Sequence, residues 1–291
     1  MSLLTSHDRR LVAAREHGER LISEKAQIDI GTPSVARMYD YLINGTDNYE
    51  SDRAACRELL EMAPSTRELA LINRAFLVRA VRYLAQECGI RRFIDHGSGL
   101  PTRPNVHQVA QEVDSDARVV YIDNDPLVHA HGRLMLAEDL KTTAVIEADM
   151  RDVDANFQRE GVASLLRGGE PVAALFVSVL HCIPDRDDPW RLVKSVADKL
   201  PDGSYMVISQ LASNDVDLRE QVTEFMRQTT GGNWGRVRSF DEVKRYFDEL
   251  QVVESDGPVE VSSWKPDTDL FPRQATNEWI EYGAVARIVR S

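Results

Sequence analysis

A glycine-rich turn after a short apolar run carries the pattern that most clearly indicates chemistry. The run FID at 93–95 is typical of a buried strand, and the run HGSG at 96–99 follows it directly. Glycines in such a turn let the backbone approach a ligand where a Cβ would clash. In parallel α/β sheets, ligands bind in the crevice at the carboxyl ends of the strands. The spacing D-x-G-x-G therefore predicts a small-molecule site that includes Asp95, Gly97 and Gly99.

Two further acids follow the next two predicted strands, at the same edge of the sheet. Asp123 ends the run VVYID at 119–123, and Asp149 comes just after the run TAVIE at 143–147. A carboxylate at the end of the second strand can accept both hydroxyls of a ribose. One after the third strand can accept a hydrogen bond from an exocyclic amine. Because the set lacks a basic partner for phosphate, it favours a cofactor with a ribose, an adenine and an amino-acid tail.

The same turn departs from the fingerprint of dinucleotide-binding proteins. Thr102 occupies the position of the third glycine, and Pro101 and Pro104 interrupt the start of the next helix. A pyrophosphate at a helix N-terminus, and with it a nicotinamide-dependent oxidoreductase, is therefore disfavoured. A structural alternative stays open, because short glycine turns and strand-end acids also serve simply as turns and helix caps.

Alternating strands and helices must position these residues, which predicts an α/β fold with a mainly parallel sheet. Strands are expected at 93–95, 119–123, 143–147, 172–177 and 205–209, with two more at 251–254 and 284–289. Helices are expected at about 34–43, at 51–88 with a break near Pro64, from 105, and at 126–138, 189–200, 216–228 and 240–250.

The N-terminal third differs from the rest of the chain. Strand signals begin only near Arg92, so we predict a helical arm and cap over residues 1–90 and a Rossmann-like core over residues 91–291. Between the predicted helices, aromatic, acidic and amide side chains occur without apolar periodicity. Tyr39, Asp47 and Asn48 are therefore expected to face a ligand as a lid or acceptor site. A helix pair with capping residues is the alternative.

Bulk properties exclude several classes of protein. A net charge of −12 argues against nucleic acid as the main partner, because phosphates are neutralised by clustered Lys and Arg. The three cysteines are distant and no pair of histidines resembles a metal site, so neither a disulfide framework nor a metal centre is supported, and the cysteines favour a reducing cytoplasm. The longest apolar run, at 172–180, is about half a membrane span, and the first residues lack the core of a signal peptide. The oligomeric state stays open, a homo-oligomer included.

Taken together, the motifs resemble those of class I S-adenosylmethionine-dependent methyltransferases. The closer resemblance is to the actinobacterial S-adenosyl methyltransferase family, formerly a domain of unknown function, and it covers the chain from about residue 30. The residues that carry it are ARMYDYLINGTDNY at 36–49 with DR at 52–53, IDHGSGLPT at 94–102, NVH at 105–107, YIDNDP at 121–126 and VLHCIPD at 179–185. The resemblance implies a sheet of about seven strands with a reversed last strand, and a helical N-terminal cap.

By position, the resemblance also implies S-adenosyl-L-methionine as cofactor and a role for each matching residue at its methionine end. Gly97 and Gly99 would lie against the methionine part, and Asp95 would approach its amino group. Ser178, just past the fourth strand, would stand where the methyl group emerges. His96 departs from the small or apolar residue more usual between the Asp and the Gly, a difference that concerns the local polarity of the pocket and not the fold.

At the nucleoside end the resemblance implies four contacts. Asp123 would hold the ribose with Asn124 nearby, while Asp149 and the backbone N–H of Met150 would contact the adenine. These positions predict a methyltransferase that acts on an unidentified small-molecule acceptor. A non-catalytic nucleoside-binding module that works through a protein partner is the alternative from another class.

Acceptor chemistry needs a base only if the acceptor must lose a proton, since most of the acceleration can come from holding the acceptor and the methyl group in line. His181, in the loop after the fourth strand, is the best-placed candidate, with Tyr39 as a second. A loop histidine bonded to backbone is the alternative for His181. Trp234, near two glycines, is expected on a mobile acceptor loop.

Overall fold

An eight-stranded sheet forms the centre of the computed structural model, which describes residues 29–135, 141–266 and 278–290. The strand order is β3-β2-β1-β4-β5-β8-β6, and β7 pairs with β8 off this path. The strands are β1 (Arg92–His96), β2 (Arg118–Asp123), β3 (Thr143–Glu147), β4 (Ala173–Val177), β5 (Tyr205–Ala212), β6 (Gln251–Val253), β7 (Val259–Glu260) and β8 (Ile280–Arg287). Strands β1 to β5 pair in parallel, whereas β8 runs antiparallel to β5, β6 and β7. The predicted α/β class with a reversed last strand is confirmed, and the unpredicted β7 is too short to leave an alternating pattern.

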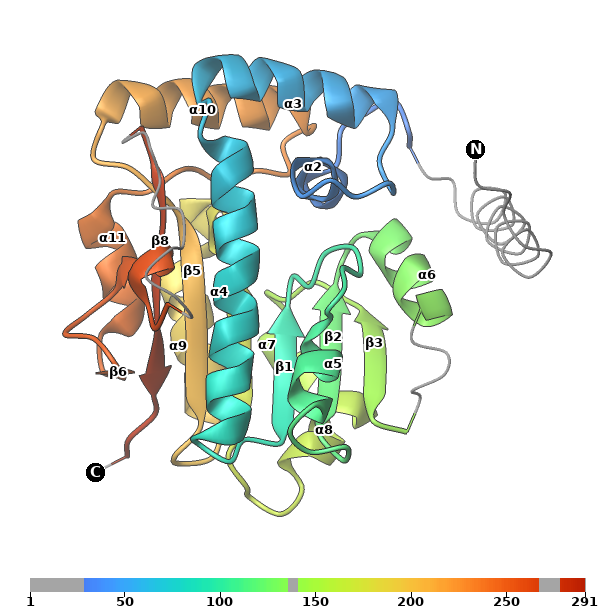
Figure 1. The fold of residues 1–291 in the computed structure, drawn as a ribbon, viewed down its shortest axis with the longest axis vertical. Helices are drawn as coiled ribbons and strands as arrows, with labels where there is room; N and C mark the ends of the chain where they lie inside the picture. The colour runs from blue at the N-terminus through green and yellow to red at the C-terminus, as the bar shows by residue number, and fades with distance from the viewer. Residues whose placement is uncertain (1–28, 136–140, 267–277, 291) are drawn as a thin grey trace.

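Helices cover both faces of the sheet (Figure 1). They are α2 (Val35–Leu42), α3 (Glu50–Met62), α4 (Thr66–Gln86), α5 (Val106–Gln111), α6 (Pro126–Met135), α7 (Val153–Gln158), α8 (Glu160–Leu166), α9 (Pro189–Lys199), α10 (Val216–Thr229) and α11 (Phe240–Lys244). Successive strand residues point to opposite faces, so Phe93 packs in the cluster under α4 and α5 while Ile94 packs in the cluster under α7, α8 and α9. The arm predicted before residue 29 and the end of the helix predicted at 126–138 lie outside the described residues.

The helix α4 belongs to the core of the sheet domain. Phe76 and Leu84 of α4 are fully buried in the same hydrophobic cluster as Phe93 of β1 and Val207 of β5. Figure 1 shows α4 lying across the sheet, while α2 lies beyond the ends to which the arrows of β1 and β2 point. The division predicted at residue 90 falls between α4 and β1, which share this cluster, and Met38 of α2 and Leu59 of α3 belong to it as well.

The structure refines the predicted elements locally. His107 of α5 is buried, and its Nδ1 lies 2.8 Å from the Tyr121 hydroxyl. The helix predicted at 240–250 ends at Lys244 and continues as a 3₁₀ turn over Arg245–Phe247. Helices α7 and α8 were not predicted. Among the helices described, none is long and apolar enough to span a membrane.

Candidate functional site

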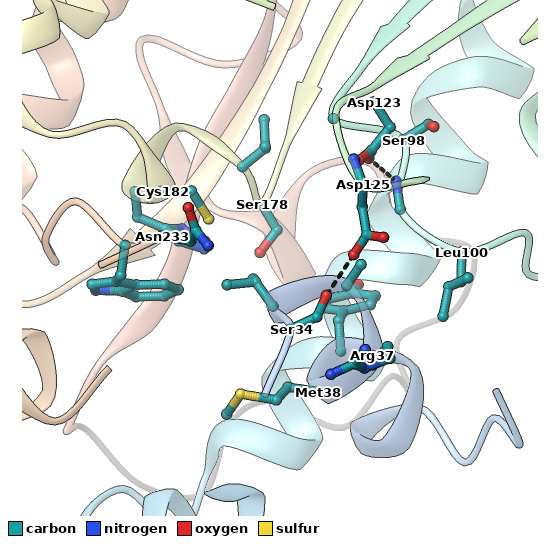
Figure 2. A pocket seen from close by; sticks show the side chains of 18 of the residues that line it. Ser34, Arg37, Met38, Ser98, Leu100, Asp123, Asp125, Ser178, Cys182 and Asn233 are labelled. Carbon is teal, nitrogen blue, oxygen red and sulfur yellow. Dashed lines mark hydrogen bonds between the residues drawn. The ribbon is translucent and has the colours of Figure 1, made fainter. Parts of the chain in front are cut away.

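A cavity of about 630 Å³ lies at the carboxyl ends of the parallel strands. Three acids line it together with Gly97 and Gly99: Asp95 near the end of β1, Asp123 at the end of β2 and Asp149 just after β3. Figure 2 shows Asp123 at one side of this cavity and Cys182 and Asn233 at the other, with Ser178 between them. The volume is that of a pocket for a small molecule. The structure thus brings the predicted acids and glycines to one place.

The backbone amides of the glycine turn are all engaged by β2. The N–H groups of Gly97 and Ser98 donate to the carbonyl oxygen of Ile122, at 2.8 and 3.3 Å. The Gly99 N–H donates to Oδ2 of Asp123 at 2.9 Å. A pyrophosphate would need such amides to point outward. These hydrogen bonds therefore argue against the nicotinamide-dependent alternative.

The two glycines of the turn serve different purposes. Both have positive φ, +69° at Gly97 and +65° at Gly99. A Cβ on Gly97 would lie 2.3 Å from Cγ2 of Val179 and 2.8 Å from Cε of Met150, so packing requires its absence. A Cβ on Gly99 would meet no atom of the described residues within 4 Å, and Gly99 lines the cavity. The space beside Gly99 is therefore space for a ligand.

Burial raises the pKa of two of the acids, Asp95 and Asp123. Asp95 is 6% exposed, and burial raises its pKa to about 7, with Arg74 opposing the rise and Asp123 adding to it. Burial likewise raises the pKa of Asp123, although its oxygens accept from the N–H groups of Gly99 and Asp125. A ligand with a cationic group or hydroxyls would donate hydrogen bonds to these carboxylates in place of the water that burial excludes.

Asp149 is paired with an arginine side chain. Burial alone would raise its pKa, but hydrogen bonds from Arg151 outweigh burial and hold the pKa below its usual value. Nε of Arg151 lies 3.0 and 2.9 Å from the two carboxylate oxygens, and the same guanidinium also bonds Asp187. Arg151 was not predicted. Any ligand amine that bonds Asp149 would compete with this guanidinium.

Comparisons with known proteins agree with this geometry. Residues 22–289 match the model of a family described as S-adenosyl methyltransferase. The crystal structure of a candidate methyltransferase from Thermobifida fusca YX is 37% identical, covers 90% of this chain and 97% of that chain, and has a TM-score of 0.82. A DUF574 family protein from Streptomyces avermitilis MA-4680 is 35% identical over 89% of this chain and 99% of that chain, with a TM-score of 0.81. No curated protein matches the sequence.

This chain belongs to the S-adenosyl methyltransferase family. S-adenosylmethionine is therefore its cofactor, and the resemblance drawn from the motifs is confirmed. The family match gives no support to the nicotinamide-dependent or the non-catalytic alternative.

The cap of this S-adenosyl methyltransferase is tied to the cofactor side of the cavity by Ser34. Its hydroxyl donates to Oδ2 of Asp125 at 2.7 Å, across 91 residues of chain (Figure 2). Its backbone N–H donates to Asp52 of α3, which also pairs with Arg37 at 2.9 Å. Ser34 occupies the N-cap of α2 without capping it, because its hydroxyl is used elsewhere. The sequence interpretation did not predict this contact.

The predicted lid residues have mostly structural contacts. Tyr39 lines the cavity, but its hydroxyl donates to the Ala70 carbonyl and accepts from Asn73, and burial raises its pKa to about 12. Asp47 and Asn48 are not among the described residues that line the cavity. Both donate to Oδ2 of the buried Asp40 at 2.8 Å, Asp47 through its backbone and Asn48 through its amide. The inward orientation predicted for these two residues is therefore not what the structure shows.

A substitution at Asn48 tests this assignment. Asn48→Ala removes the donor to Asp40 and the acceptor for Arg53. We expect a loss of about 1–3 kcal/mol in the free energy of unfolding, since the bond is to a carboxyl group, and an unchanged affinity for S-adenosylhomocysteine. Chemical denaturation and calorimetry measure the two quantities. A folded variant of normal stability with weakened binding would return Asn48 to the ligand site.

The predicted base, His181, is a poor proton acceptor. It is 3% exposed, its Nδ1 accepts from the Leu211 N–H at 3.4 Å, and its ring tilts against Trp234 at 4.6 Å. Burial, helped by Arg238, lowers its pKa to about 3. A base this weak takes a proton inefficiently near neutral pH. Trp234 is itself buried, and it lines the cavity beside His181.

Proposed function

We propose that this protein transfers the methyl group of S-adenosylmethionine to a small molecule with an apolar or aromatic body. The observation that carries this proposal is one cavity with two unlike parts. Its cofactor part holds the three strand-end acids and the glycine turn. Its other part, called here the acceptor lobe, is lined by apolar and aromatic side chains: Met38, Leu59, Ala70, Leu77, Leu211, Met226, Trp234 and Trp279.

The cofactor part fits the methionine end of S-adenosylmethionine. Gly99 leaves room where a Cβ would project into the cavity. Asp95, with its raised pKa, would regain its charge beside the amino group of the methionine part. Bound there, the cofactor supplies an electrophilic methyl carbon on a sulfonium. Ser178, at the centre of the cavity, would lie near that carbon (Figure 2).

Four residues would hold the nucleoside. Asp123 keeps lone pairs for the ribose hydroxyls beyond those used by Gly99 and Asp125. Asn124 lines the cavity next to it, and Asp149 and Met150 line the adenine end. Because Arg151 already bonds Asp149, contact with the adenine amine would require it to give up part of that pairing.

The acceptor lobe favours a small apolar body over a polymer. A lobe lined by four helices, one strand and two buried tryptophans excludes water, which strengthens electrostatic interactions with the sulfonium. A net charge of −12 opposes nucleic acid. The free cysteines Cys56, Cys88 and Cys182 suit a reducing cytoplasm, which we propose as the compartment.

Ligand binding tests the proposed function directly. We expect S-adenosylhomocysteine to bind with an affinity in the micromolar range, and NAD to give no measurable heat in the same calorimeter cell. The reason is the acid and glycine set without outward-facing amides. Radiolabelled methyl transfer from S-adenosylmethionine into a cell extract then reports turnover. Tighter binding of NAD would reverse the assignment, and binding without any turnover would favour the non-catalytic alternative.

A further inference from the structure

A serine and a glutamate from distant strands meet between the two parts of the cavity. Ser178 follows β4, and Glu281 lies on β8, 103 residues later in the chain. The Ser178 hydroxyl donates to Oε1 of Glu281. Both residues line the cavity, and Figure 2 shows the Ser178 hydroxyl pointing into it. This pair lies where the cofactor part and the acceptor lobe join.

Glu281 is buried without the partners that a buried acid needs. It is 1% exposed, and its Oε2 has no hydrogen-bond partner among the described residues. Burial raises its pKa to about 8, and only the Ser178 hydroxyl opposes the rise. An unsatisfied carboxyl oxygen is costly in a folded protein. A carboxyl group of this kind in the wall of a cavity is therefore a candidate to bind a ligand or to accept a proton from it.

Ser178 is held in an unusual conformation by its neighbours. Its φ is +55°, in the left-handed region that a serine seldom adopts. Its N–H donates to the carbonyl oxygen of Ser209 at 2.9 Å and to the Ser209 hydroxyl at 3.2 Å. The Ser209 hydroxyl in turn donates to Asn73 of α4 at 2.6 Å. Backbone strain of this kind persists where the surroundings hold it, and here it aims a hydroxyl at the cavity.

We propose that Ser178 and Glu281 form the proton-accepting pair of the acceptor lobe, and that the acceptor is a hydroxyl or an amine. This inference rests on the proposed function. A lone pair on the acceptor oxygen or nitrogen forms a bond to the methyl carbon, and the carbon–sulfur bond breaks with its electron pair left on sulfur. The acceptor proton passes to Oγ of Ser178 while the Ser178 proton passes to Oε1 of Glu281. Release of the product returns that proton to solvent.

Two observations favour this pair and this acceptor class. The two other candidate bases are less suited, because His181 has a pKa near 3 and already accepts from backbone, while burial raises the pKa of Tyr39 to about 12. A carboxyl whose pKa lies near the operating pH is an efficient general base. A thiol ionises readily without such help, whereas a hydroxyl or an ammonium-forming amine must lose its proton to a partner.

A pair of cofactor analogues tests the proposal without knowledge of the acceptor. Sinefungin carries an amine on carbon in place of the methylated sulfur, so its ammonium group would occupy the place of the methyl group. S-adenosylhomocysteine carries nothing there. Glu281→Gln should weaken the affinity for sinefungin about tenfold or more, as expected for a lost charged hydrogen bond. The affinity for S-adenosylhomocysteine should change by less than about twofold. Ser178→Ala should likewise weaken the affinity for sinefungin more than the affinity for S-adenosylhomocysteine.

Controls separate the possible failures. Glu260→Gln on β7, outside the described lining of the cavity, should leave both affinities unchanged. Equal changes for both ligands, or none, in Glu281→Gln would overturn the proton-accepting pair. Failure of both ligands to bind the unaltered protein would instead refute the proposed function. Should Glu281→Gln fail to fold, the ligand ratio of Ser178→Ala decides the question.

Discussion

Gly97→Ala should lower the free energy of unfolding by roughly 2–5 kcal/mol and disrupt the cofactor site. A φ of +69° costs an alanine about 1–2 kcal/mol. The new Cβ would also lie 2.3 Å from Cγ2 of Val179 and 2.8 Å from Cε of Met150, and forced overpacking adds about 1–3 kcal/mol. Since Met150 lines the cavity at the end proposed for the adenine, its displacement should weaken the binding of S-adenosylhomocysteine as well. Denaturant unfolding and calorimetry measure both effects.

The matched control is Gly99→Ala, two residues along the same turn. Its φ of +65° imposes a similar backbone cost, but its Cβ would meet no described atom within 4 Å. Stability should therefore fall by only about 1–2 kcal/mol, while the methyl group enters the space proposed for the cofactor. Wild-type affinity in Gly99→Ala would show that this turn does not contact the cofactor. Equal stability losses in both variants would refute the packing argument for Gly97.

Asp123→Asn should weaken S-adenosylhomocysteine by roughly 1.5–3 kcal/mol, the scale of hydrogen bonds to a charged group. The asparagine keeps the shape of the side chain but replaces one accepting oxygen with a donor. That donor would face the N–H of Gly99 or of Asp125, both of which donate to Asp123. We chose asparagine over alanine because alanine would leave the Gly99 amide without its acceptor.

A double-mutant cycle separates a ribose contact from damage to the turn. S-adenosylhomocysteine and its 2′-deoxy analogue are each titrated into the unaltered protein and into Asp123→Asn. If Asp123 accepts from the ribose, removal of the hydroxyl weakens binding to the unaltered protein and has little further effect in the variant. An identical loss in both proteins would remove Asp123 from the ribose.

The cofactor side of the cavity was largely accessible from the sequence because its signals are local. Each acid lies at or just after the carboxyl end of a short strand, and parallel strands place these ends at one edge. Asp95, Asp123 and Asp149 therefore had to converge once the strands were recognised. The glycine spacing was equally informative, since a positive φ with a tight approach excludes other residues at Gly97.

The acceptor side of the cavity could not be predicted from the sequence, because the burial of its residues depends on neighbours that are distant in the chain. Nothing near His181 in the sequence shows that Trp234 packs against it, or that burial, together with Arg238, lowers its pKa. Asp47 and Asn48 looked like free polar groups, but a buried carboxylate at Asp40 engages both. Local composition reports the type of a side chain and not the partners that decide its charge.

Glu281 illustrates the difference most sharply. In the sequence it is one acid in a run that alternates poorly, and no motif marks it. Strand β8 lies between β5 and β6 and runs antiparallel to both. This arrangement brings Glu281 into a hydrogen bond with Ser178, which is 103 residues earlier in the chain. Periodicity and glycine spacing act over a few residues, so the family, the sheet and the strand-end acids could be predicted without knowledge of the fold. Which polar groups are buried, paired or left open to a ligand depends on sheet order and desolvation, and these are set by residues far apart in the chain.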